Sequence, residues 1–286
     1  MSATRLRSVL LGSVMCGLLA ACTTSNVGAR QLSLDNVGRI PGVDASSGVV
    51  VTDGVRAELS ALEGSVLGPN AAGNRLLMIG DSILAGTASR YGGEMCDTLV
   101  PLGWRVALEA EAGQMIGFGR TVLRDRIYEG WDAAVVFLGT NYGGIIESYT
   151  RDLTAIVTSL APRPTLLLTP TEFKTSMKQV TEAVRVIAAK NAHVSVLDWG
   201  TASLQPGVLN KDKVHPSVAG RKVLVASIAA AIGSPPSGTG SCLASKYTND
   251  TLVDDDVMPS VDTSMPKTTS STSTTAVPIT SSTVIQ

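Results

Sequence analysis

Aromatic residues are scarce in this sequence, and neither sign of charge dominates. Phe, Trp and Tyr together make up 4% of the 286 residues, and the formal net charge is -1 at pH 7. Proteins that bind nucleic acids present aromatic stacking surfaces or an excess of positive charge, so we expect no nucleic-acid partner. The sequence also lacks a Cys/His cluster with metal-ligand spacing and lacks Walker and G-x-G-x-x-G motifs, so we expect no metal and no cofactor.

The N-terminal residues are typical of an export signal. Arg5 and Arg7 precede an apolar stretch, residues 9–21, that is too short for a comfortable membrane span. This stretch runs into Leu19-Ala20-Ala21-Cys22, which resembles the lipobox of bacterial lipoproteins. The resemblance implies a signal peptide over residues 1–21, lipid on Cys22 and a membrane-anchored, extracytoplasmic location. An ordinary secretory signal with an incidental cysteine is the alternative.

Cysteine is infrequent as well, with four residues in the chain. Cys16 would leave with the signal peptide and Cys22 would carry lipid, which leaves Cys96 and Cys242. In an oxidising compartment such a pair predicts a disulfide, which would tie the segment after the last helix to the first helix. Two buried free thiols are the alternative.

The remaining chain divides into three segments. Residues 22–74 are rich in Gly, Ser, Val and Asn and predict a flexible tether that includes one short helix within Val55–Leu67. Residues 75–233 are expected to form the folded domain. Residues 234–286 predict a disordered tail, because 15 of the 27 residues from Ser260 onward are Ser or Thr. The tail is either a wall-spanning or O-glycosylated segment or a plain solvated one.

Within residues 75–233, short runs rich in Val and Leu alternate with longer amphipathic stretches. This alternation predicts an α/β fold, a three-layer α/β/α sandwich of flavodoxin-like type with a five-stranded parallel sheet. The expected strands cover residues 75–79, 105–109, 133–138, 165–169 and 194–198, and the expected helices cover residues 83–101, 115–129, 145–160, 175–191 and 217–232.

Ser82 is the candidate nucleophile. It follows the first strand and the turn-forming pair Gly80 and Asp81, so it lies at the carboxyl edge of the sheet, where open α/β sheets bind ligands. A serine hydroxyl is a weak nucleophile and needs a neighbouring base. We interpret Asp81 as the residue that holds the turn, not as a catalytic carboxylate.

The base must be one of two histidines. His193 lies at the amino end of the fifth strand, on the opposite edge, and is predicted to be structural. His215 lies in the loop after that strand, on the same edge as Ser82. Asp212 is three residues earlier and can accept a hydrogen bond from the imidazole, whereas Asp198, at the end of the fifth strand, is a competing acid.

An oxyanion formed at Ser82 needs hydrogen-bond donors already directed at it. Gly113 follows the second strand and Asn141 follows the third, so both lie at the same edge as Ser82. The Gly113 N–H, the Asn141 side-chain amide and the Ser82 N–H are therefore candidate donors. A helix-start turn at Gly113 and a helix cap at Asn141 are the alternatives.

Taken in order, these residues resemble a known family, the SGNH or GDSL-type hydrolases. The resemblance rests on Gly80-Asp81-Ser82, Gly113, Gly139-Thr140-Asn141 and Asp212-Lys213-Val214-His215, and it covers residues 75–233. It implies Ser82 as nucleophile, His215 as base, Asp212 as the acid that orients it, and Gly113 and Asn141 in the oxyanion hole. The sequences of the last two motifs, which contain Asn141 and His215, are most similar to those of SGNH domains associated with cell-surface acyltransferases.

The predicted function is therefore that of an extracytoplasmic, lipid-anchored serine esterase. It would hydrolyse small acyl esters, such as O-acetyl groups on envelope glycans, through an acyl-enzyme on Ser82. An O-acyltransferase that uses the same mechanism is one alternative, and a non-catalytic lipoprotein that binds envelope glycans is another. The expected partners are the acyl ester or acylated glycan and the membrane, and no protein partner is evident.

Overall fold

The computed structural model describes residues 61–251, and a seven-stranded sheet runs through this part of the chain. The strands are β1 (Leu62–Glu63), β2 (Arg75–Gly80), β3 (Arg105–Ala110), β4 (Ala133–Phe137), β5 (Thr165–Leu168), β6 (Val194–Leu197) and β7 (Ser241–Cys242). The α-helices are α2 (Ser82–Ala85), α3 (Glu94–Leu99), α4 (Gly117–Arg126), α5 (Ile146–Leu160), α6 (Met177–Ala189), α7 (Trp199–Ala202) and α8 (Val218–Ile232). The short 3₁₀ helices are η2 (Gly68–Asn70), η3 (Ser89–Tyr91) and η4 (Ile127–Glu129).

The centre of the sheet has the predicted flavodoxin-like topology. The strands β6-β5-β4-β2-β3 are neighbours in that order and all pair in parallel. The prediction of five strands is incomplete, because a two-residue strand extends each edge. β1 pairs antiparallel with β6, and β7 pairs in parallel with β3. Both additions are too short to carry a recognisable alternating pattern.

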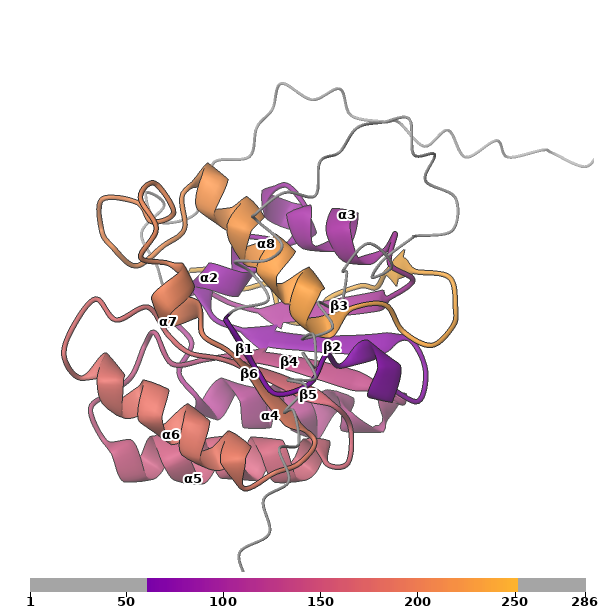
Figure 1. Ribbon diagram of the computed structural model, residues 1–286, viewed down its shortest axis with the longest axis horizontal. Helices are drawn as coiled ribbons and strands as arrows, with labels where there is room; N and C mark the ends of the chain where they lie inside the picture. The colour runs from indigo at the N-terminus through magenta and orange to yellow at the C-terminus, as the bar shows by residue number, and fades with distance from the viewer. Residues whose placement is uncertain (1–60, 252–286) are drawn as a thin grey trace, which may run out of the picture. The chain divides into compact units, whose positions relative to one another are not determined.

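Helices cover both faces of the sheet, as the Val- and Leu-rich strands predict. Alternate residues of each strand point to opposite faces, so Leu76 and Met78 of β2 pack in one core and Leu77 and Ile79 in the other. The first core lies under α3 and α8, and the second lies under α4, α5 and α6 (Figure 1). The result is the three-layer α/β/α sandwich that the sequence predicts.

The strand register aligns the carboxyl ends of β2, β3 and β4, and the candidate site residues follow these ends in the sequence. Gly80, the last residue of β2, pairs with Ala110 of β3 and with Phe137 of β4. The loops that contain Ser82, Gly113 and Asn141 therefore leave neighbouring strands at one level of the same edge. The chain passes from β2 to β3 on one side of β2, and then from β3 to β4 on the other side of β2. This reversal of strand order creates the topological switch point where α/β proteins bind ligands.

Some predicted helices are wrong in extent. The helix expected over residues 83–101 divides into α2, η3 and α3. Ala88 is extended and separates α2 from η3, and Gly92 and Gly93, with φ angles of 130° and 89°, separate η3 from α3. The helix expected within Val55–Leu67 is contradicted by its described part, where Leu62–Glu63 form β1. Its residues up to 60 lie outside the described part of the chain.

The chain beyond Gly233 is ordered further than its composition predicts. Residues 241–251, here named the C-terminal strap, follow the outer edge of β3, beginning with β7 (Figure 1). Leu243 N donates to Val106 O at 2.7 Å, and Ser245 Oγ donates to Leu108 O at 2.6 Å. The strap therefore packs on the sheet beyond Gly233, the residue at which the sequence predicts the folded domain to end.

A buried carboxylate on β3 also holds the C-terminal strap. Glu109 is 0% exposed, forms an ion pair with the buried Arg126, and accepts the backbone N–H groups of Lys246 and Tyr247 at 2.9 Å each. A buried charge is costly unless it is paired and hydrogen-bonded, and here both conditions are met. Glu109 thus holds the strap through the strap's main-chain N–H groups, so this contact does not depend on the side chains of the strap.

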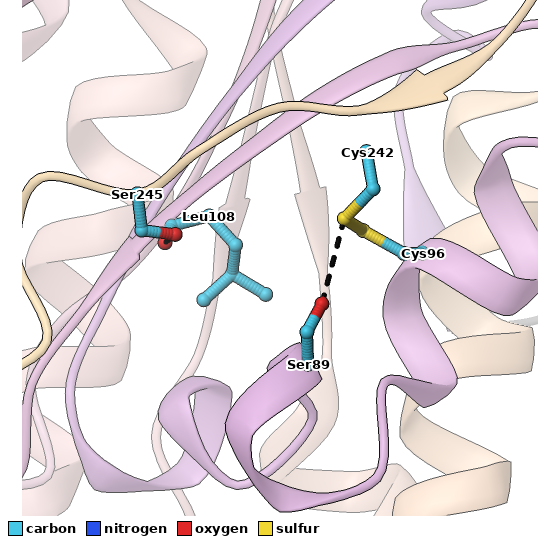
Figure 2. The surroundings of a disulfide bond; sticks show 5 residues. All are labelled: Ser89, Cys96, Leu108, Cys242 and Ser245. Carbon is cyan, nitrogen blue, oxygen red and sulfur yellow. Dashed lines mark hydrogen bonds between the residues drawn. A yellow bond between two sulfur atoms is a disulfide. The ribbon is translucent and has the colours of Figure 1, made fainter. Parts of the chain in front are cut away.

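The predicted disulfide is present in the structure. Cys96 of α3 is bonded to Cys242 of β7, with a Cα–Cα distance of 5.6 Å and a sequence separation of 146. Figure 2 shows this bond beside Ser89, whose Oγ lies 3.5 Å from Cys242 Sγ, and shows Ser245 of the strap next to Leu108 of β3. The disulfide therefore attaches the start of the C-terminal strap to the layer of α3 and α8.

Replacing both Cys96 and Cys242 with serine is expected to destabilise the protein by about 2 to 5 kcal/mol, because the long loop that the disulfide closes is then released in the unfolded state. Urea denaturation of the oxidised wild type and the double variant measures this difference. Equal midpoints for the two proteins would contradict a disulfide in solution.

No helix within residues 61–251 is long and apolar enough to cross a membrane. The predicted signal peptide, the lipid on Cys22 and the Ser/Thr-rich residues after 251 lie outside the described part of the chain.

Candidate active site

Ser82 lies where β2 turns into α2. Asp81 caps this helix, with its Oδ1 accepting the Ile83 N–H at 3.1 Å. Gly80 permits the turn because a Cβ at this position would lie 2.5 Å from the Cβ of Leu84. Ser82 itself is 4% exposed.

Ser82, His215 and Asp212 form one continuous chain of hydrogen bonds. The distance from Ser82 Oγ to His215 Nε2 is 2.9 Å, and the distance from His215 Nδ1 to Asp212 Oδ2 is also 2.9 Å. The carboxylate at Nδ1 favours the tautomer with a proton on that nitrogen, which leaves Nε2 free to accept the Ser82 proton. Their roles in catalysis stay predictions, but the geometry is that of a serine nucleophile with its base and orienting acid.

A tight turn builds the acid and base into one loop. Asp212 Oδ1 accepts the N–H groups of Val214 and His215, at 2.9 and 3.1 Å, so one carboxylate oxygen holds the turn while the other contacts the ring. Lys213, in the middle of the turn, has a φ of 59°, a conformation that non-glycine residues rarely adopt. The left-handed conformation of Lys213 turns the chain so that His215 lies next to Asp212.

The same hydrogen bonds keep Asp212 ionised. Burial would raise the pKa of Asp212, but the N–H groups of Val214 and His215 and the His215 ring together hold it below the ordinary value. The acid is therefore a carboxylate over the whole pH range in which an imidazole changes charge.

The alternative acid and base lie away from Ser82 in the structure. Asp198 accepts hydrogen bonds from Arg185 Nη2 at 2.7 Å and from Thr169 Oγ1 at 2.9 Å, and it caps α7 through Thr201. His193 directly precedes β6, at the amino edge of the sheet, opposite to Ser82. Neither residue contacts the hydrogen-bonded chain of Ser82, His215 and Asp212.

Both candidate oxyanion loops lie beside Ser82. Gly113 has a φ of 74°, and its N–H donates no hydrogen bond to an acceptor within residues 61–251. Asn141 Nδ2 donates to Gln114 O at 3.1 Å, which ties the loop after β4 to the loop after β3 and leaves the second amide hydrogen for a ligand. The structure thus places both donors at the edge that holds Ser82, while their contact with an oxyanion stays a prediction.

A cavity of about 270 Å³ opens next to Asn141. It is mostly apolar and could hold an acyl or alcohol group of an ester bound at Ser82. Its lining consists of Met115, Ile116, Gly139, Asn141, Tyr142, Gly143, Ile145, Ser148 and Tyr149. A larger cavity of about 530 Å³, between α4 and α5, includes none of the candidate site residues in its lining, so we do not assign it to catalysis.

Asp81, the residue before the nucleophile, is a buried carboxylate. Burial raises the pKa of Asp81 from the ordinary 3.8 to about 6, against the opposing effects of the Ile83 N–H, Thr140 and the nearby His215. The folded state therefore binds a proton more tightly than the unfolded state between these values. By linkage, stability falls as the pH rises from about 4 to about 6 and then levels off.

Replacing Asp81 with asparagine is expected to stabilise the protein above pH 6 by up to about 3 kcal/mol, because the uncharged amide keeps the cap without a buried charge. Below pH 4 the two proteins should be equally stable. Denaturation at pH 4 and pH 8 measures the two differences, and a stability gain that is the same at both pH values would contradict the explanation.

Several residues around the site were not predicted from the sequence. Gln114 links the two oxyanion loops, and Asp250 and Arg90 contact the loop after β3. Asp250 lies in a segment with the composition of a tail, although its position after Cys242, which is predicted to bond to Cys96, indicates that the chain returns to the domain. Among residues 61–251 no group of three His, Cys, Asp or Glu side chains is placed to hold a metal ion.

Comparison with known proteins gives matches only among solved structures. No family model matches the chain, and no curated protein does. The catalytic domain of Streptococcus pneumoniae peptidoglycan O-acetyltransferase A is 22% identical, with a TM-score of 0.46 over 56% of this chain and 93% of that one. A protein from Desulfitobacterium hafniense that is assigned to a lipolytic G-D-S-L family is 19% identical, with a TM-score of 0.47 over 56% of this chain and 99% of that one.

A third similar structure is the family 3 carbohydrate esterase of Clostridium thermocellum. It is 15% identical, with a TM-score of 0.45 over 54% of this chain and 92% of that one. The assignment of function therefore depends on the site geometry described above.

Proposed function

We propose that the protein is a serine esterase that hydrolyses small acyl esters through an acyl-enzyme on Ser82. The observation that carries this proposal is the pair of 2.9 Å hydrogen bonds that connect Ser82, His215 and Asp212. An arrangement with only a structural role would not need a hydroxyl, an imidazole with a defined tautomer and an ionised carboxylate hydrogen-bonded in that order.

The first half of the reaction forms the acyl-enzyme. Ser82 Oγ attacks the ester carbonyl carbon while its proton passes to His215 Nε2, and the carbonyl oxygen becomes an oxyanion. The N–H groups of Ser82 and Gly113 and the Asn141 amide donate hydrogen bonds to that oxyanion. The bond to the alcohol oxygen then breaks, and His215 gives its proton to the departing alcohol.

The second half releases the acid and restores the enzyme. A water molecule attacks the acyl carbon and loses a proton to His215 Nε2. The bond to Ser82 Oγ then breaks, and His215 returns the proton to Ser82. In both halves Asp212 accepts the Nδ1–H of the ring, which orients the imidazole and stabilises its charged form.

We propose O-acetyl esters of cell-envelope glycans as the substrate class and a lipid on Cys22 as the anchor. An anchored enzyme would meet such glycans directly, and the exposed loop of Asp212 and His215 leaves the site open to a polymeric substrate. The cavity beside Asn141 would receive the acyl group. A hydroxyl acceptor in place of water would make the same acyl-enzyme the intermediate of an O-acyltransferase.

The test is an activity screen with p-nitrophenyl acetate, butyrate and octanoate and with O-acetylated envelope glycan. The Ser82→Ala variant defines the background, and Ser89→Ala, at an exposed serine of the same region, is the matched control. We expect Ser82-dependent release of acetate from both acetyl esters, at the same rate in Ser89→Ala as in the wild type. Equal product release by the wild type and Ser82→Ala on every ester would contradict the proposal.

A further inference from the structure

The C-terminal strap ends on the loop that carries Gly113. Asp250 Oδ1 accepts the Ala112 N–H at 2.9 Å, and its Oδ2 accepts from Arg90 Nε at 2.7 Å and from Tyr91 Oη at 2.9 Å. Arg90 in turn donates from Nη2 to Ala110 O at 2.7 Å. The Arg90–Asp250 ion pair therefore binds the main chain on both sides of residue 111, at the Ala110 carbonyl and at the Ala112 N–H.

A second contact extends from the strap to the other oxyanion donor. Asn249 N donates to Glu111 Oε1 at 2.9 Å, and Gln114 Nε2 donates to Glu111 Oε2 at 2.9 Å. The carbonyl of Gln114 is the acceptor for Asn141 Nδ2. A continuous series of hydrogen bonds thus connects the strap to the Asn141 amide.

The loop needs such external support because of its own composition. Gly113 has a positive φ and no side chain, so no side-chain packing at this position restricts the backbone and the direction of its N–H. The peptide groups before it are instead fixed by Arg90 and Asp250, whose side chains are 22% and 10% exposed. A largely buried, multiply hydrogen-bonded ion pair holds geometry more firmly than an exposed one.

We propose that Asp250, paired with Arg90, is a positioning residue that aims the Gly113 N–H at the oxyanion. This inference rests on the proposed esterase function. Asp250 touches no reacting atom and acts through Ala112. Burial would raise the pKa of Asp250, but the hydrogen bonds from Arg90, Ala112 and Tyr91 hold it below the ordinary value, which agrees with a permanently charged clamp.

The test compares kcat and KM for p-nitrophenyl acetate in Asp250→Ala, Asp250→Asn and Lys246→Ala. Lys246 is the matched control, because its Nζ binds Glu129 at 2.8 Å and secures the same strap away from the oxyanion loop. For Asp250→Ala we expect kcat to fall about 10- to 100-fold, with KM changed less than about 3-fold, because a displaced donor weakens binding of the transition state more than of the substrate. Asp250→Asn should fall between Asp250→Ala and the wild type, since its amide oxygen still accepts the Ala112 N–H. Lys246→Ala should match the wild type.

Thermal unfolding of the same variants separates positioning from stability. A lower melting temperature for Asp250→Ala with wild-type kcat would assign the residue a structural role and overturn the inference. Equal kcat values for Asp250→Asn, Asp250→Ala and Lys246→Ala would overturn it too, while the esterase proposal would stand. A folded wild type without Ser82-dependent activity would instead contradict the esterase proposal, and the inference with it.

Discussion

Replacing His215 with alanine is expected to lower kcat/KM for ester hydrolysis by about 10⁴-fold, because Ser82 then has no group to take its proton. The 2.9 Å contact between Ser82 Oγ and His215 Nε2 is the only route from the hydroxyl to a base among the described residues. Substrate binding should change little, since the imidazole acts on the proton and not on the ester in its ground state.

His193→Ala provides the matched control, because it removes the other histidine of the chain from the opposite edge of the sheet. Steady-state kinetics on p-nitrophenyl acetate should show wild-type activity for this variant. A His215→Ala protein that keeps more than a tenth of the wild-type rate would contradict the assignment of the base.

Replacing Asp212 with asparagine is expected to lower kcat by about 10³- to 10⁴-fold, through the tautomer of the ring. An amide NH₂ placed at His215 Nδ1 would favour the tautomer that carries its proton on Nε2. That nitrogen could no longer accept the Ser82 proton. The amide oxygen could still hold the turn through Val214 N and His215 N, so the fold should be retained.

Asp198→Asn is the control for this prediction, because Asp198 is the other carboxylate that the sequence offers to His215. It should lose stability through its contacts with Arg185 and Thr169, yet keep kcat near the wild-type value. Loss of activity in Asp198→Asn and its retention in Asp212→Asn would contradict the placement of the acid.

The central strands and the turn of Asp212 and His215 could be predicted because local sequence determines them. Each parallel strand is a short Val- and Leu-rich run, and burial on both faces requires such a run. Asp212 and His215 are three residues apart, so a single turn suffices to bring the acid to its base. Ser82 follows a strand and a glycine, which fixes the edge of the sheet on which it lies.

Apart from its attachment at Cys242, the C-terminal strap could not be predicted, because non-local contacts determine it. Residues 234–240 are rich in Gly, Ser and Pro and have the composition of a linker, so they give no indication of the strand that follows. The strap is held by carboxylates of β3 and its loop, Glu109 and Glu111, which accept main-chain N–H groups. Glu109, an acidic residue among the apolar residues 106–110, was a further signal, since a buried carboxylate requires partners from elsewhere. Asp250 and its contact with Ala112 depend on that placement.

The most direct test of the account is the reaction of the folded protein with a fluorophosphonate. Such a probe forms a bond from Ser82 Oγ to phosphorus with loss of fluoride, and it does so only at a serine that a base activates. Intact-mass measurement and peptide mapping should find one adduct per chain, on the peptide that contains Ser82, with none in Ser82→Ala and strongly slowed labelling in His215→Ala. An unlabelled wild type, or an adduct that forms equally fast in Ser82→Ala, would contradict Ser82 as an activated nucleophile.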